Sequence, residues 1–139
     1  MSATLGAACR VLLVGGLANL VLSFVLGWVL SAYRAKGPME PHRWLLTAHE
    51  VALQEGLLLL GLSYALTFAA LSGGMAIVAA WLLVVASAFQ DFSGVVNWLR
   101  GTKDQFAEKS AGWILASINA VLNTTGLAIV VVGVVRGLW

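Results

Sequence analysis

The chain of 139 residues contains one cysteine, two prolines and two histidines, and only 10% of its residues are charged. A single cysteine excludes an intrachain disulfide, and two histidines are too few for a three-nitrogen metal centre within one chain. No basic stripe with interleaved aromatic residues is present, so no nucleic-acid partner is predicted. Hydrophobic residues make up 60% of the chain, which is typical of a membrane protein.

Four long apolar runs account for nearly all of the sequence, at approximately 11–32, 44–71, 75–98 and 111–138. About 20 apolar residues are enough for a helix to cross the hydrocarbon core of a bilayer. Backbone groups in lipid must be satisfied within the segment, and these runs are too long and too uniform for barrel strands. The sequence therefore predicts an all-α membrane protein, with residues 1–139 forming a single four-helix transmembrane domain in a lipid bilayer.

The basic residues are unevenly divided between the two predicted membrane faces. Two of them, Arg10 and Arg136, accompany the termini, whereas six lie in or beside the two longer loops, namely Arg34, Lys36, Arg43, Arg100, Lys103 and Lys109. Cytoplasmic loops are enriched in Lys and Arg. The sequence thus predicts a protein of a bacterial-type cytoplasmic (inner) membrane with cytoplasmic loops and both termini outside.

Polar residues on three predicted helices fall at similar depths. Counted inward from the loop ends at 1.5 Å per residue, His49 lies about 9 Å deep, Asp91 about 13 Å, Asn119 about 15 Å and Glu55 about 18 Å. Ionisable groups at such depth are costly and usually functional. We predict that the four residues form one site, although His49 and Glu55 point in directions about 120° apart on their helix. We expect His42 to be solvated at the interface, and Asn19 and Asn123 to serve helix packing.

The residues around His49 narrow the chemistry. His49-Glu50 begins like a zinc-protease helix, but the second histidine of that motif is replaced by Leu53. A single buried histidine is still sufficient as the protein ligand of a haem, because the macrocycle supplies four nitrogens.

Short motifs in the second and third runs resemble those of the styrene oxide isomerases, small four-span membrane proteins that contain haem b. The motifs are Thr47-Ala48-His49, Glu55 directly before Gly56, and Asp91 followed seven residues later by Trp98. The resemblance implies that His49 is the axial ligand of the haem iron and that Glu55 and Asp91 are catalytic pocket residues. It also implies a homotrimer with haem between neighbouring subunits.

The sequence departs from the family at two pocket positions. Glu55 stands where the family has Asn, and Leu99 stands where it has a Tyr directly after Trp98; neither Tyr33 nor Tyr64 is an evident substitute. We assign Trp98, Leu99 and Asn119 to the predicted substrate pocket.

The resemblance implies an isomerase that opens a hydrophobic aryl epoxide and shifts a hydride to give the aldehyde. Three other functions are consistent with the sequence. The first is a membrane haem protein without isomerase activity, with a redox or sensory role, for which Leu99 is unsurprising. The second is a small proton-coupled exporter, although such proteins carry their essential Glu in the first span, where this chain has Asn19. The third is a purely structural subunit, which does not account for the depth of Glu55 and Asp91.

Overall fold

The computed structural model describes residues 3–38 and 40–139, and this part of the chain contains helices and no strand. Four long helices, α1 (Ala3–Arg34), α2 (Arg43–Ala65), α3 (Gly73–Leu99) and α4 (Ala111–Leu138), are accompanied by two short 3₁₀ turns, η1 (Glu40–His42) and η2 (Leu66–Phe68). Each long helix, with η2 continuing α2, is long and apolar enough to cross a membrane. The structure therefore confirms the predicted all-α membrane fold with four spans.

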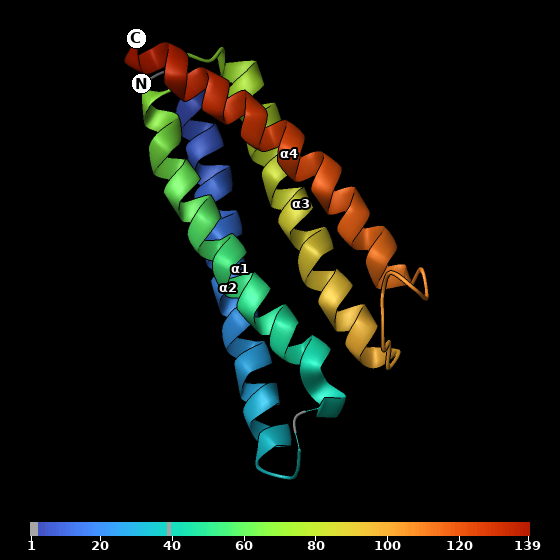
Figure 1. Ribbon diagram of the computed structural model, residues 1–139. Helices are drawn as coiled ribbons and strands as arrows, with labels where there is room; N and C mark the ends of the chain where they lie inside the picture. The colour runs from blue at the N-terminus through green and yellow to red at the C-terminus, as the bar shows by residue number, and fades with distance from the viewer. Residues whose placement is uncertain (1–2, 39) are drawn as a thin grey trace.

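The helices form two antiparallel pairs, α1 with α2 and α3 with α4 (Figure 1). Helix α3 also packs on both α1 and α2, whereas α4 packs mainly along α3 and touches η2. Both termini lie at one end of the bundle, and the two pairs diverge toward the other end (Figure 1). Helices α1, α2 and α3 therefore make a three-helix group, and α4 lies outside it.

Gly16 of α1 and Gly56 of α2 allow these two helices to approach each other closely. A Cβ atom on Gly16 would lie 2.9 Å from the carbonyl oxygen of Gly56, and one on Gly56 would lie 3.0 Å from the carbonyl oxygen of Gly16. Small residues at such crossings are the usual means by which membrane helices pack tightly. The crossing brings α1 and α2 together within the bilayer.

The second helix ends earlier than the predicted span of 44–71. It is α-helical to Ala65, and the backbone has an extended conformation at Ala69. The Ala70 amide donates a hydrogen bond to the Gly133 carbonyl oxygen of α4 at 2.9 Å. Because Gly133 and Gly137 have no side chains, the segment after η2 can lie directly against α4. The apolar run is therefore longer than its helix because the last residues pair with another element.

The first helix, in contrast, extends beyond the predicted run of 11–32 at both ends. Its N-terminal residues remain helical because Ala8 and Leu12 are fully buried in the core shared with α2 and α3. Packing, rather than hydropathy, sets the length of this helix.

Two apolar clusters border the middle of the bundle. The larger one, nearer the termini, includes Leu12, Leu59 and Leu83. The smaller one, nearer the two long loops, is built on Leu26, Leu45 and Ala48. On α1 the residues between Leu12 and Leu26 include Asn19 and Ser23, both buried. The polar residues of the site therefore lie between two water-excluding layers.

Candidate functional site

His49 is held against α1 by Ser23. The Nδ1 atom of His49 lies 2.8 Å from the backbone carbonyl oxygen of Ser23 and 3.1 Å from its Oγ. The Ser23 hydroxyl donates in turn to the carbonyl oxygen of His49 at 3.0 Å. Because a carbonyl oxygen only accepts hydrogen bonds, Nδ1 carries the proton and Nε2 carries the lone pair.

The other ring nitrogen, Nε2, has no hydrogen-bond partner among residues 3–38 and 40–139. Histidines that ligate metals usually donate their second ring N–H to a carbonyl or carboxylate, which fixes the tautomer and the ring orientation. His49 has this arrangement. No group of three or more His, Cys, Asp or Glu side chains in the described part of the chain could hold a bare metal ion. The donor set therefore fits a haem, which needs one protein ligand.

The predicted carboxylates lie on α2 and α3, two helices that pack against each other. Glu55 is half-buried, whereas Asp91 is 3% exposed. The Oδ1 atom of Asp91 is buried and has no hydrogen-bond partner in the described part of the chain. A buried oxygen without a donor is uncommon in proteins and calls for an explanation.

A cavity of about 170 Å³ lies between α1 and α3 beside Asp91. Its wall is mostly apolar, and its polar members Asn19, Ser87 and Asp91 are all buried; the lining residues are Gly15, Ala18, Asn19, Leu22, Val84, Ser87, Ala88, Asp91 and Phe92. The Oδ1 atom of Asn19 is also buried without a partner in the part that the structure describes. The cavity therefore has mostly apolar walls, and two of the residues that line it, Asn19 and Asp91, each carry a buried oxygen without a partner in the described part of the chain.

The amide side chains of Asn19 and Asn119 donate hydrogen bonds between helices. Asn19 Nδ2 donates to the Ser87 hydroxyl at 3.0 Å and to the Gly15 carbonyl oxygen at 2.9 Å, so the packing role predicted for Asn19 is confirmed. Asn119 Nδ2 donates to Gln90 Oε1 at 2.8 Å. This bond holds Asn119 on the α3–α4 contact, and Asn119 is not part of the cavity lining.

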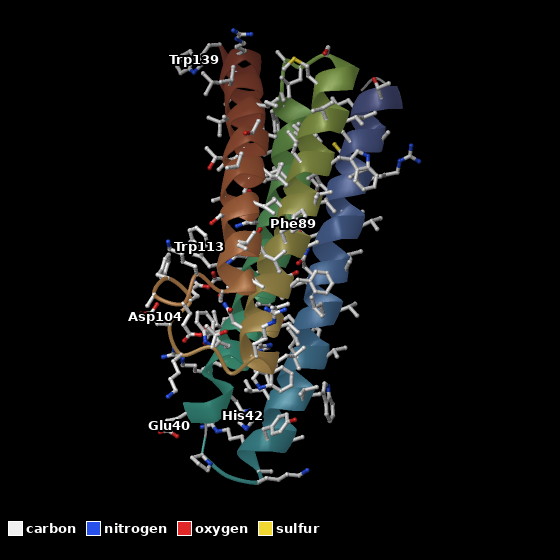
Figure 2. All side chains as sticks on the ribbon, turned by 90° about the vertical axis from the view of Figure 1, so that its right-hand side faces the viewer. Glu40, His42, Phe89, Asp104, Trp113 and Trp139 are labelled. Atoms are coloured by element: carbon white, nitrogen blue, oxygen red, sulfur yellow. The ribbon has the colours of Figure 1, made fainter. Side chains whose placement is uncertain are left out.

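Trp98 belongs to a different cluster. Its Nε1–H donates to His42 Nδ1 at 3.2 Å, and the His42 ring lies 4.1 Å from the Tyr33 ring, centroid to centroid. His42 is therefore half-buried at the loop end of the bundle, because Trp98 and Tyr33 contact part of its ring. Figure 2 places His42 at the loop end of the bundle, with Glu40 and Asp104 and opposite Trp139.

The structure also locates Leu99 and Tyr33. Leu99 is 70% exposed at the end of α3. Tyr33 contacts Trp98, with ring centroids 5.7 Å apart, so the structure places a phenol beside Trp98 that comes from α1. The structure does not bring Trp98, Leu99 and Asn119 together into one pocket.

Sequence reasoning missed the contribution of α1. Ser23 and the cavity face of Asn19 were not predicted, because hydroxyl and amide groups in an apolar run give a weak signal. One face of α1 carries a stripe of small or polar residues at helical spacing, namely Gly16, Asn19, Ser23 and Gly27. This stripe indicates the face of α1 that packs toward α2 and α3.

Comparisons of the chain with protein-family models, with curated proteins and with solved structures give no match.

Proposed function

We propose that this protein is a haem b-dependent epoxide isomerase of the membrane, with His49 as the axial ligand of the iron. The observation that carries the proposal is the state of His49, whose Nδ1–H is committed to Ser23 while Nε2 has no partner in the described part of the chain. This imidazole lies in the same layer as Asp91 and Glu55, between two apolar clusters. When bound, a ferric haem supplies a Lewis acid that polarises an epoxide oxygen.

The residues of the chain perform the remaining tasks. The cavity between α1 and α3 offers mostly apolar walls to the hydrocarbon part of a hydrophobic epoxide. Ring opening and a 1,2-hydride shift to the aldehyde pass through positive charge on carbon. The unpaired Asp91 oxygen is placed to stabilise that charge electrostatically in a site of low dielectric. Glu55 adds a second negative group on the opposite helix.

The surroundings of the site suit a substrate that enters from lipid. The cavity has apolar walls, and the two apolar clusters keep bulk water from the cationic centre, which water would otherwise attack. Basic residues at the loop end favour a bacterial inner membrane with the loops cytoplasmic and both termini outside. A homotrimer with haem between subunits, as the family resemblance implies, completes the proposal.

The first test is the absorption spectrum of the protein purified in detergent. We expect a Soret band that His49→Ala removes. His42→Ala is the matched control, because His42 lies in the Trp98 cluster, and it is expected to retain the band. Absence of a Soret band from the wild type, or its survival in His49→Ala, refutes the haem proposal.

The second test separates isomerisation from haem binding alone. The purified holoprotein is incubated with an aryl epoxide, and the aldehyde is measured by chromatography. We expect aldehyde without added electron donors, because the reaction involves no net oxidation or reduction. A protein with an intact Soret band and no aldehyde product would instead be a haem protein with a redox or sensory role.

A further inference from the structure

The contact between His49 and α1 depends on two small residues one helical turn apart, Ser23 and Gly27. We call this pair the Ser23–Gly27 notch. Ser23 is 3% exposed, and all three short polar contacts between α1 and the His49 residue are made by Ser23. Ser23 is 26 positions from His49 in sequence.

Gly27 gives the imidazole access to the Ser23 carbonyl. In a continuous α-helix the Ser23 carbonyl oxygen also accepts from the Gly27 amide, and a carbonyl has a second lone pair for another donor. A Cβ atom on Gly27 would lie 3.1 Å from His49 Cε1 and 3.3 Å from Nδ1. A larger side chain at position 27 would therefore occupy the space in which the ring lies.

The Ser23 hydroxyl fixes the backbone of the partner helix. It donates to the His49 carbonyl oxygen at 3.0 Å, so the side chain of Ser23 sets the position of α2 along α1 at the residue that carries the ring. The Ser23 carbonyl sets the ring itself. The two contacts together determine the position of the imidazole along α1 and the orientation of its ring.

We infer that the Ser23–Gly27 notch is a positioning site that holds His49 in the Nδ1-protonated tautomer and keeps Nε2 available as a ligand atom. Ser23 and Gly27 act through His49. The notch is a property of the protein alone, whereas its use to present Nε2 to a haem iron rests on the proposed function. Loss of the partner that accepts a hydrogen bond from the other ring nitrogen of a metal-ligating histidine typically changes metal affinity by about 10- to 100-fold.

The experiment has one readout without haem and one with it. In the haem-free protein, ¹⁵N NMR of labelled histidine reports which ring nitrogen of His49 is protonated, with His49→Gln used to assign the signals. Haem titration of the same protein then gives the dissociation constant. The variants are Ser23→Ala, Ser23→Thr and Gly27→Leu. Gly61→Leu is the matched control, since a Cβ on Gly61 meets nothing within 4 Å.

We expect a proton on Nδ1 in the wild type, in Ser23→Thr and in Gly61→Leu. Gly27→Leu is expected to give a mixture of tautomers and a haem dissociation constant raised about 10- to 100-fold. Ser23→Ala keeps the backbone carbonyl and is expected to raise the constant by a smaller factor, which Ser23→Thr restores.

A wild-type signal from a protonated Nε2 would overturn the inference. So would a Gly27→Leu variant whose tautomer and haem affinity match those of Gly61→Leu. If the Nδ1 tautomer depends on Gly27 but the wild type binds no haem, the notch stands and the proposed function is refuted. The two failures are therefore distinguishable.

Discussion

Replacing Asp91 by Asn is expected to stabilise the protein and to slow the proposed isomerisation. Asp91 Oδ1 and Asn19 Oδ1 are both buried acceptors without a donor in the described part of the chain, and both side chains line the same cavity. An amide at position 91 is nearly isosteric with the carboxyl group but brings an N–H₂ donor. It removes one unmatched acceptor and supplies a donor for the other.

The magnitude follows from the cost of a buried polar atom without a partner, which is about 1–3 kcal/mol. The Asp91→Asn variant is expected to gain stability of this order. For a chain of this size, about 1 kcal/mol corresponds to roughly 2–4 °C in Tm. The expected rise in Tm, measured by thermal unfolding in one detergent, is therefore roughly 2–12 °C.

The expected change in activity is a loss, in contrast to the expected gain in stability. Loss of the carboxylate charge removes the electrostatic stabilisation proposed for the cationic centre, and the loss of one such group typically costs about 10²–10³ in kcat. Because His49 and Ser23 are unchanged, the Soret band is expected to persist. A stable, haem-loaded variant with slower aldehyde formation is the predicted combination.

Asp104→Asn is the matched control for stability. Asp104 Oδ1 accepts hydrogen bonds from the amides of Phe106 and Ala107 at 2.9 and 3.1 Å, so its substitution is expected to lower Tm. A lower Tm for Asp91→Asn as well would refute the reasoning, because it would mean that the Asp91 oxygens already have partners that an amide cannot replace. Full activity in Asp91→Asn would refute its electrostatic role.

Two further predictions concern the loop end of the bundle. Hydrogen bonds from the backbone N–H groups of Ala107 and Phe106 lower the pKa of Asp104, with a further contribution from the charge of Arg43. A lowered pKa in the folded state stabilises the turn above the unfolded pKa of about 3.9, and this stabilisation is lost as the pH falls through the folded pKa. We expect the amide NMR shifts of Phe106 and Ala107 to titrate with a midpoint below that value, whereas a midpoint at or above it would contradict the assignment. Gly112→Ala is expected to cost about 1–3 kcal/mol in stability, since its Cβ would collide with the Asn97 side chain. The effect is measured by thermal unfolding, with Gly74→Ala as the control because a Cβ on Gly74 meets nothing within 4 Å. Equal Tm values for the two variants would contradict the prediction.

The spacing of the polar residues along each helix was predictable from the sequence, because helix rise is nearly constant. Their partners were not. Asp91 and Trp98 are seven residues apart and share a helical face in sequence, yet Trp98 bonds His42 near Tyr33, whereas Asp91 lines the cavity beside Asn19. Helices diverge along their length, so residues on one face of α3 meet different neighbours at different heights.

The end of the second helix shows the same limit. The apolar run continues to Leu71, but Ala70 bonds the Gly133 carbonyl of α4. Hydropathy measures the solvent that a residue prefers, and both a helix and a segment packed against another helix satisfy it. The choice between them depended on two glycines more than 60 residues away.

The sequence by itself determined that the protein spans a membrane four times as helices, because the bilayer core leaves the backbone of a long apolar segment no other way to satisfy its hydrogen bonds. It also determined that one deep histidine is present, since composition and depth depend on local sequence alone. Only the tertiary structure decided that the Ser23 carbonyl accepts a hydrogen bond from His49 Nδ1–H and that Nε2 has no partner in the described part of the chain. It likewise decided that Asn19 and Asp91 line one cavity. These arrangements join different helices, and the first of them depends on how closely Gly16 and Gly56 allow α1 and α2 to approach.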